Sequence, residues 1–330
     1  MHARAFRKTA LICGFAAASA FVSYPAAHAA SDDYSAFVWS TSSASEPTIY
    51  DFINSATSSL DMTMYELVDT TAENDLIALE NDGVDVRVIL DVAEKSKNQA
   101  AYTALTDAGV GVVWSSTSFT YTHQKTITVD DDESLILSGN LTSTYYTSTR
   151  DYGVFDTDAN DVSAIVDTFN ADYAHTSITP SDGDDLVWSP TDSQSQLVSL
   201  VESATTSIDV EEEEFSDTAL INALVADADD GVAVRVVVED PSDYSSEITK
   251  LDNAGAEVVG YPESDALYIH AKAIVVDYGE SDAAVEVGSM NWTSNSLNNN
   301  RELGIILHDS AAETVVEDQF NSDFAGGTSE

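Results

Sequence analysis

Basic residues are the scarcest feature of this 330-residue sequence. Twelve Lys and Arg stand against 58 Asp and Glu, which gives a formal net charge of −46 at pH 7. A chain with this charge repels nucleic acid and anionic membranes at long range in dilute buffer. Binding of an anionic substrate therefore requires that some of the few basic side chains are gathered in one place.

Cysteine is almost absent, since Cys13 is the only one. It lies within residues 1–30, a segment that has no acidic residue, carries basic residues ahead of the apolar run Leu11–Val22 and ends in Ala-His-Ala at 27–29. This layout is typical of a secretory signal peptide. We therefore expect a secreted protein, extracellular or periplasmic, that begins near residue 31 and has no disulfide, no reactive thiol and no thiolate metal site.

Long apolar runs are also missing. No stretch after residue 30 reaches the ~18 consecutive apolar residues that span a bilayer, so we expect no stable membrane span. The composition is otherwise that of a globular protein, with 43% hydrophobic and 9% aromatic residues. The length suits about two domains.

The sequence contains an internal duplication. The four arginines after residue 30 form two pairs: Arg87 and Arg235 each follow Gly-Val-x-Val and lie 148 residues apart, and Arg150 and Arg301 each precede an acid and lie 151 residues apart. Such a repeat is far longer than a solenoid repeat. It predicts two similar lobes, residues 31–178 and 191–330, joined by a linker at 179–190. We expect Arg87 and Arg235 to pair with carboxylates, whereas Arg150 and Arg301 could assist a site.

Both lobes show the same order of expected elements. In the first lobe, helical spacing covers 48–59, 71–81, 97–107 and 161–173, and strand-like runs cover 60–67, 84–90, 109–114, 122–130, 134–138 and 152–155. The second lobe repeats this order over 193–324. Continuous apolar strands that alternate with helices predict α/β lobes, each with a largely parallel or mixed sheet flanked by helices.

The rarest side chains recur at one spacing. His123, Lys125 and Asp130 form the pattern His-x-Lys-x4-Asp, and a second copy follows 147 residues later. Alternation along a strand places His and Lys on the same face, so that an imidazole and an ammonium point to one place. Each motif is followed by Ser-x-Asn and then an acid. The second motif and the two sets of following residues are His270, Lys272 and Asp277; Ser138, Asn140 and Asp151; and Ser289, Asn291 and Glu302.

This doubled pattern resembles the phospholipase D superfamily, whose signature is two such motifs, each followed by a Gly/Ser–Asn segment and an acid. The resemblance spans essentially all of residues 31–330. It implies two α/β lobes about a pseudo-twofold axis, one active site at their junction, and no metal or other cofactor. It also implies that His123 is the nucleophile and His270 the acid, which the symmetry of the sequence alone leaves open.

The residue types suit cleavage of a phosphodiester. A neutral imidazole attacks phosphorus to form a phosphohistidine, and an imidazolium protonates the leaving oxygen. Asp151 and Glu302 are suited to fixing the histidine tautomers, and Asp130 and Asp277 are expected to be structural anchors. The side chains expected to bind the phosphate oxygens are Lys125, Lys272, Asn140, Asn291, Ser138 and Ser289.

Other charged residues allow weaker interpretations. The run Glu211–Glu214 is typical of a solvated patch, although Glu214 aligns with Glu66 and this pair could line the site. Isolated histidines and lysines outside the motifs are expected at the surface. They are His175, His308, Lys95, Lys97 and Lys250.

Three functions compete: a phospholipase or phosphatidyl transferase, a nuclease, and a binding protein without activity. The last is weakest, because both halves keep every reactive residue type. A nuclease needs a row of basic side chains along the nucleic acid, and few cations remain outside the motifs to form one. Short single strands could instead stack on aromatic rings. We favour a monomeric phospholipase D-type enzyme, because amphipathic rings near the motifs suit a lipid–water boundary. These rings are Trp114, Phe119, Tyr121, Tyr145, Tyr146, Tyr261, Tyr268 and Trp292.

The acidity predicts a dependence on salt. Loss of Arg4, Arg7 and Lys8 with the signal peptide leaves nine basic residues against 58 acids, a net charge of −49. We interpret this first as adaptation to high salt, second as adaptation to a strongly acidic medium, and third as a feature without environmental meaning.

Dilution of salt should therefore unfold the secreted chain, because the Debye length grows from ~3 Å at 1 M to ~10 Å at 0.1 M and exposes the carboxylates to one another. Lower pH at low salt should restore some fold but not activity, because the attacking imidazole must stay neutral. Circular dichroism and activity over a grid of salt and pH test this. Full stability and activity in dilute buffer would contradict it, and an optimum near ~pH 3, where carboxylates protonate, would favour the acidic medium.

Overall fold

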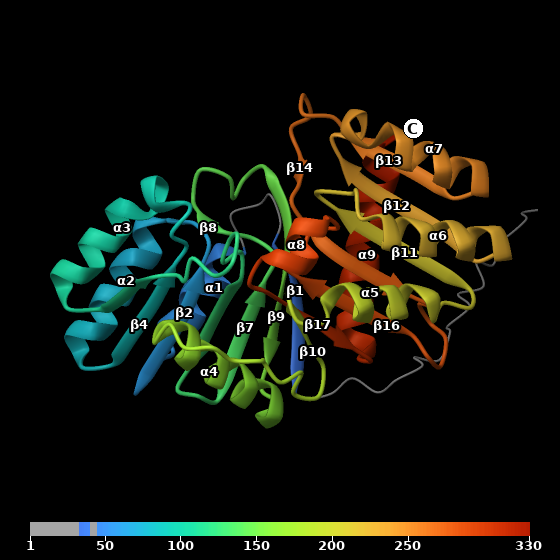
Figure 1. The fold of residues 1–330 in the computed structure, drawn as a ribbon. Helices are drawn as coiled ribbons and strands as arrows, with labels where there is room; N and C mark the ends of the chain where they lie inside the picture. Colours follow the sequence, from blue (N-terminus) through green and yellow to red (C-terminus); the bar gives the residue numbers. More distant parts are fainter. Residues whose placement is uncertain (1–32, 40–44) are drawn as a thin grey trace, which may run out of the picture.

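The computed structural model describes residues 33–39 and 45–330. The expected signal peptide at residues 1–30 lies outside the described residues. The chain forms two α/β lobes side by side, each with a mixed sheet flanked by helices (Figure 1). The predicted fold class of two similar lobes is confirmed.

The sheet of the first lobe has the order β1-β9-β7-β6-β2-β4-β5. Its strands are β1 (Tyr34–Trp39), β2 (Ser59–Met64), β4 (Asp85–Leu90), β5 (Gly111–Trp114), β6 (Lys125–Val129), β7 (Glu133–Leu137) and β9 (Thr149–Asp156). Its helices are α1 (Glu46–Ile53), α2 (Thr70–Asp82), α3 (Lys95–Ala108) and α4 (Ala159–Tyr173). Strands β2, β4 and β5 are parallel, whereas β6, β7, β9 and β1 pair antiparallel. A short parallel pair, β3 (Leu67–Val68) and β8 (Leu141–Thr142), lies apart from this sheet.

The sheet of the second lobe repeats this arrangement in the order β10-β17-β16-β15-β11-β12-β13-β18. Its strands are β10 (Leu186–Ser189), β11 (Ser207–Glu212), β12 (Ala233–Glu239), β13 (Glu257–Tyr261), β15 (Lys272–Val276), β16 (Ala284–Gly288), β17 (Glu302–Leu307) and β18 (Thr328–Ser329). The helices are α5 (Ser193–Glu202), α6 (Thr218–Asp230), the 3-10 turn η1 (Pro241–Tyr244), α7 (Ser245–Ala254), α8 (Ser294–Asn299) and α9 (Ser310–Gly326). Strand β14 (Tyr268–Ile269) leaves this lobe and pairs with β9 of the first.

The linker is shorter than the sequence suggested. Residues 186–189 were expected in the linker but form β10, which pairs antiparallel with β17. Leu186, Val187 and Trp188 are buried, so this short apolar run belongs to the core of the second lobe. The sequence did not predict this strand because the run is short and lies among Ser, Asp and Pro residues.

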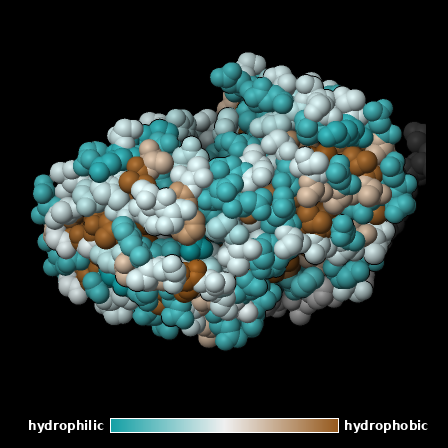
Figure 2. Space-filling model, in the orientation of Figure 1, coloured by the Kyte–Doolittle hydropathy of each residue, from teal (hydrophilic) through white to brown (hydrophobic). Residues whose placement is uncertain are grey.

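Three apolar cores hold the layers together. One lies in the first lobe under α1, α2 and α3, and one lies in the second lobe under α5, α6 and α7. The third core contains residues of both sheets and of α4 and α9, so it joins the lobes. Because each sheet has apolar contacts on both faces, its strands are the continuous hydrophobic runs seen in the sequence. On the face shown in Figure 2, hydrophobic residues form small separate patches among hydrophilic ones.

The four arginines after residue 30 stabilise the fold through carboxylates. Arg87 bonds Asp61 and Arg235 bonds Asp209, each inside its own lobe. Arg150 and Arg301 instead reach the other lobe: Arg150 Nε lies 2.6 Å from Asp323 in α9, and Arg301 Nε lies 2.8 Å from Asp172 in α4. The role in a site that the sequence left open for Arg150 and Arg301 is therefore replaced by a structural one, because both guanidinium groups are committed to ion pairs between the lobes.

The last residue of each sequence motif anchors a turn. Asp277 has a left-handed backbone (φ 51°) and accepts hydrogen bonds from the backbone N–H groups of Thr205, Thr206 and Ser207 and from both threonine hydroxyls. Asp130 makes the equivalent bonds to residues 57–59. Burial disfavours the ionised form, but these donors outweigh it and hold the pKa of Asp277 below its usual value. Each motif therefore ends at a pinned turn that fixes the preceding strand.

Removal of this charge should destabilise the fold. Asp277→Asn should lower the free energy of unfolding by about 2 kcal/mol at neutral pH, the scale of hydrogen bonds to a charged group. Asn tolerates a left-handed backbone, so the variant isolates the carboxylate. Because the pKa is lowered in the fold, the difference should be full above ~pH 4 and shrink as pH falls through that lowered pKa.

Urea denaturation at several pH values measures this difference. Asp131→Asn is the matched control, because Asp131 is exposed and also has a left-handed backbone (φ 57°). Equal stability of Asp277→Asn and the control at neutral pH would contradict the anchoring role.

Candidate active site

The segment that carries each motif histidine crosses to the opposite lobe. Before His270, β14 pairs with β9, and the N–H of His270 donates to the carbonyl of Arg150 at 3.1 Å. Before His123, Thr122 forms a bridge to Arg301, and the N–H of His123 donates to the Arg301 carbonyl at 2.9 Å. The two halves therefore exchange the segments that carry their histidines.

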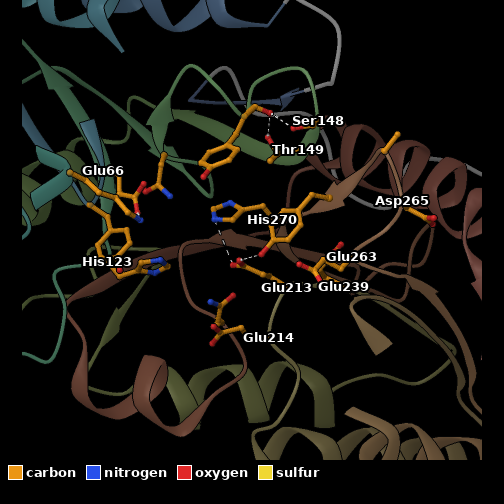
Figure 3. A pocket seen from close by; sticks show the side chains of 17 residues that line it. Glu66, His123, Ser148, Thr149, Glu213, Glu214, Glu239, Glu263, Asp265 and His270 are labelled. Atoms are coloured by element: carbon orange, nitrogen blue, oxygen red, sulfur yellow. Dashed lines mark hydrogen bonds and ion pairs between the residues drawn. The ribbon is translucent and has the colours of Figure 1, made fainter. Parts of the chain in front are cut away.

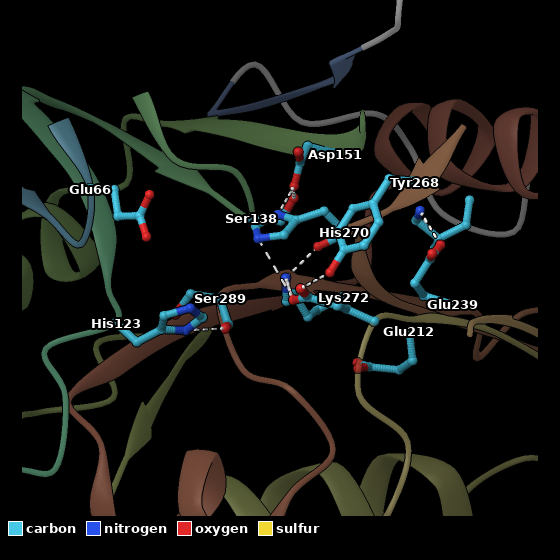
Figure 4. Close-up of polar contacts among 12 residues, drawn as sticks. Glu66, His123, Ser138, Asp151, Glu212, Glu239, Tyr268, His270, Lys272 and Ser289 are labelled. Atoms are coloured by element: carbon cyan, nitrogen blue, oxygen red, sulfur yellow. Dashed lines mark hydrogen bonds and ion pairs between the residues drawn. The ribbon is translucent and has the colours of Figure 1, made fainter. Parts of the chain in front are cut away.

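Each imidazole is bonded by a carboxylate of the other lobe, and Figure 4 shows the pair of His270 and Asp151. His123 Nδ1 lies 2.8 Å from Glu302 Oε2, and His270 Nδ1 lies 2.7 Å from Asp151 Oδ1. Burial opposes ionisation of both acids, but the facing histidine and lysine hold the pKa of Asp151 and of Glu302 below its usual value. An ionised carboxylate only accepts, so Nδ1 carries a proton in each ring. Nε2 of each ring is then the atom available for chemistry.

The carboxylates are held in turn by buried polar groups. Ser138 Oγ donates to Asp151 Oδ1 at 2.7 Å, and Ser296 and Asn300 donate to Glu302 Oε1 at 2.5 and 2.8 Å. The carbonyl oxygen of Ser289 lies 3.1 Å from His123 Nδ1. Ser138 and Ser289 are both fully buried. They were expected among the phosphate ligands, but the structure places them behind the imidazoles, where the strand ends turn inward.

Both motif lysines are buried beside the histidines. Lys125 Nζ donates to the His123 carbonyl at 2.7 Å, and Lys272 Nζ donates to the His270 carbonyl and, at 2.7 Å, to Glu213 Oε2. Burial and the neighbouring Lys272 lower the pKa of Lys125 to about 7. Burial opposes the charge of Lys272 as well, but Glu213 and Asp151 raise its pKa above the usual value. The site thus holds cations whose charge an anion would stabilise.

A cavity of about 570 Å³ lies between the lobes, and both histidines line it (Figure 3). Asn140 and Asn291 line it too, and within the described residues no hydrogen bond satisfies the buried Oδ1 of either amide. Glu66 and Glu214 are in the wall, so the structure brings this pair to the site. The other lining residues are Tyr65, Lys97, Tyr145, Ser148, Thr149, Glu213, Glu239, Glu263, Asp265, Ala266 and Tyr268.

The run Glu211–Glu214 is not a solvated patch. Glu211 and Glu212 lie in β11 and are buried, and Glu211 accepts a hydrogen bond from the Tyr152 hydroxyl at 2.6 Å. Burial raises the pKa of Glu211 to about 8. Strand β11 includes the first two residues of this run, so only the last two glutamates reach the cavity.

A sequence model of a known domain family matches the chain twice. The family described as "Cardiolipin synthase, PLD-like domain" matches residues 49–173 and 197–324. The chain belongs to the phospholipase D superfamily. The two matches also confirm the internal duplication, since each phospholipase D-like segment contains one His-x-Lys-x4-Asp motif.

Solved structures share the phospholipase D-like fold at low sequence identity. Polyphosphate kinase from Porphyromonas gingivalis has a TM-score of 0.68 and 14% identity over 88% of this chain and 50% of its own. Phosphatidylserine synthase from Haemophilus influenzae Rd KW20 has a TM-score of 0.66 and 14% identity over 86% of this chain and 84% of its own. The chain spans half the length of the kinase, and both likenesses show the fold alone. A comparison with curated proteins found no match.

The sequence did not predict several residues of this phospholipase D-like site. Lys97 is exposed at the surface, as expected, and it also pairs with Glu66 at the cavity wall. Its place at the start of α3, beyond the carboxyl end of β4, was an available signal, because sites gather at that edge of parallel strands. Ser296 belongs to α8 and Asn300 directly follows this helix, which lies outside the repeated pattern. Glu213 was hidden in the glutamate run, although it directly follows the strand that pairs with Lys272.

Proposed function

We propose that the protein is a secreted phosphodiesterase of the phospholipase D type, which hydrolyses the phosphatidyl group of phospholipids or transfers it to an alcohol. Secretion is supported by the signal-peptide pattern in residues 1–30. The chemistry is supported by two histidines, two lysines and two asparagines beside one cavity. No helix within residues 33–39 and 45–330 is long and apolar enough to cross a bilayer, so the substrate would be met at the surface of the membrane.

The first chemical step uses both imidazoles. The lone pair of His123 Nε2 forms a bond to phosphorus while the bond from phosphorus to the head-group oxygen breaks, and His270 Nε2 gives its proton to that oxygen. Lys125 and Lys272, with the amides of Asn140 and Asn291, stabilise the negative charge on the remaining phosphate oxygens.

The second step regenerates the enzyme. Water gives a proton to His270 Nε2 as its oxygen attacks phosphorus, and the electron pair of the broken bond returns to His123. The products are phosphatidic acid and the free head group. An alcohol in place of water yields the transfer product. Glu302 and Asp151 keep Nδ1 of each ring protonated throughout, so both steps proceed at Nε2.

The observation that favours a phospholipid as the substrate is a group of exposed tyrosines around the cavity. In the described part of the chain, five large hydrophobic side chains are exposed, and Tyr121, Tyr145 and Tyr268 among them line the cavity or the smaller hollow next to it. Val68 is a fourth and belongs to β3, which pairs with the residues directly after Asn140. Tyrosine rings suit the boundary between lipid and water.

The other aromatic residues that the sequence suggested for this boundary belong to the packing. Tyr146, Tyr261 and Trp292 are buried. Trp114 stacks on Tyr102 with ring centroids 4.3 Å apart, and Phe119 lies under Arg301. Three of the eight candidates therefore remain for contact with lipid.

The cavity wall disfavours the alternative, a nuclease. Six carboxylic acids line it: Glu66, Glu213, Glu214, Glu239, Glu263 and Asp265. A polyanion that continued past the reacting phosphate would lie along these groups, and like charges in a partly desolvated cleft repel. A single phosphodiester carried on a lipid needs only the buried cations at the base of the cavity.

A direct assay tests the proposal. The purified protein is incubated in high salt with phosphatidylcholine vesicles and, separately, with single-stranded and double-stranded DNA. We expect phosphatidic acid and free choline from the lipid and no cleavage of either DNA. Cleavage of DNA with intact lipid would make the protein a nuclease, and no cleavage of any substrate would favour a binding protein.

His123→Ala and His270→Ala serve as matched variants in that assay. Each should remove activity almost completely, because one composite site uses one imidazole from each lobe. Groups that act as a unit are not additive, so the double variant should be hardly worse than either single one. If each single variant kept about half the activity, the lobes would contain independent sites and the junction site would be wrong.

A further inference from the structure

The two half-sites differ at one equivalent position. Met64 is the cross-strand partner of Lys125 in the first lobe, and Glu212 is the partner of Lys272 in the second. The next residue toward the cavity is Tyr65 in the first lobe and Glu213 in the second. The pseudo-twofold axis therefore relates a neutral aromatic ring to a carboxylate, at the position that faces the motif lysine and histidine.

In the first half-site the histidine has an aromatic neighbour. The Tyr65 ring packs edge-on against the His123 ring, with centroids 4.6 Å apart, and Lys125 Nζ lies 5.3 Å from the centre of the Tyr65 ring. Among the described residues, no carboxylate forms an ion pair with Lys125. Burial and the charge of Lys125 lower the pKa of His123 below its usual value, so its Nε2 lone pair is free to attack.

In the second half-site the histidine lies between two carboxylates, of which Figure 3 shows Glu213. Asp151 Oδ1 is 2.7 Å from His270 Nδ1, and Glu213 Oε2 is 3.6 Å from His270 Nε2. Glu213 is itself held in place, because its Oε1 accepts from the Tyr268 hydroxyl at 2.6 Å and its Oε2 lies 2.7 Å from Lys272 Nζ. Burial opposes its charge, but His270 and Lys272 keep the pKa of Glu213 far below its usual value.

We propose that Glu213 is the positioning residue that gives this pseudo-symmetric site its direction: its carboxylate stabilises the imidazolium of His270, which makes His270 the acid and leaves His123 as the nucleophile. The inference rests on the phosphodiesterase activity proposed above. No sequence motif contains Glu213, and its counterpart Tyr65 cannot supply the negative charge.

The charges around His270 are consistent with this role. The charged and titratable groups that face it come from several neighbouring elements: Asp151 of β9, Glu213 and Glu214 after β11, Tyr268 of β14 and Lys272 of β15. Of the acids, Glu213 is the one that an ion pair places beside Nε2, the atom that must deliver the proton. Loss of its charge leaves the cations Lys125 and Lys272 less balanced on that side of the ring.

The variant Glu213→Gln tests the inference when its reactions with two substrates that differ in their leaving group are compared. The burst phase is measured with phosphatidylcholine and with phosphatidyl-p-nitrophenol, whose phenolate leaves without being protonated. If Glu213 acts through the acid His270, its loss should slow the release of choline and have little effect on the release of p-nitrophenol. We expect an about 10- to 100-fold slower burst with phosphatidylcholine, part of the contribution of a general acid, and a nearly unchanged burst with the p-nitrophenyl ester.

The pH profile of the same variant gives a second readout. The alkaline limb of the profile for phosphatidylcholine should move to lower pH, because the acid then lacks the neighbouring negative charge that favours its protonated form. Glu257→Gln, which removes an exposed carboxylate at the start of β13, should leave both limbs in place. Equal losses with both substrates and an unmoved alkaline limb would overturn the inference, since a merely structural residue or a phosphate-binding one gives that result.

An exchange of the two residues tests direction itself. In the parent protein, quenched during turnover and digested, mass spectrometry should find the phosphohistidine at His123. In the double variant Tyr65→Glu, Glu213→Tyr, it should move to His270. If circular dichroism shows that the double variant does not fold, the two readouts of Glu213→Gln decide the question alone.

The outcomes separate the two proposals. A phosphohistidine at His270 in the parent, or one that stays at His123 in a folded double variant, would overturn the role of Glu213 and leave the phosphodiesterase intact. Lipid cleavage without any phosphohistidine would overturn the covalent mechanism and the inference with it.

Discussion

The site depends on two hydrogen bonds between an imidazole and a carboxylate, each of which crosses from one lobe to the other. His123 is oriented by Glu302, and His270 is oriented by Asp151. Neither lobe contains a complete half-site, because the acid that orients its histidine belongs to its partner lobe. The backbone follows the same exchange, since both histidine N–H groups bond to the arginine carbonyl that precedes the opposite acid. The side chains of those arginines form further ion pairs between the lobes, so assembly of the lobes and assembly of the site are one event.

For the proposed function, this arrangement provides a place to bind a phosphate in a strongly acidic protein. Two histidines line one cavity and two lysines are buried beside them, where an anion interacts with these groups far more strongly than at the surface. Burial of these cations alone would be costly, and the carboxylates of Asp151, Glu302 and Glu213 offset that cost. The amide oxygens of Asn140 and Asn291, which lack partners among the described residues, indicate a cavity built to bind a polar group. The surface charge and the local chemistry are thus independent properties of the molecule.

The sequence predicts the parts of this site that the duplication repeats. Both motifs, the Ser-x-Asn segments and the following acids occur at equivalent positions, and alternation places each His and Lys on one face. It does not predict which lobe each acid serves, because the exchange of β14 and of the segment before His123 depends on how the lobes pack. It does not predict the hydrogen bonds of Ser138 and Ser289 either, since only the tertiary fold brings the Ser138 hydroxyl to Asp151 and the Ser289 carbonyl to His123. Glu213 differs from Glu211 and Glu212 by where β11 ends, and strand ends are the least certain part of a sequence-based assignment.

The most direct test of this account is the effect of each acid on the imidazole in the other lobe. Proton NMR of protein with isotope-labelled histidines resolves the Nδ1–H protons of His123 and His270, with His→Gln variants for assignment. In folded Asp151→Ala the hydrogen-bonded proton of His270 should be lost or shifted upfield while that of His123 is kept, and Glu302→Ala should do the reverse. A response of the histidine in the same lobe, or of neither histidine, would contradict a site assembled by exchange between the lobes.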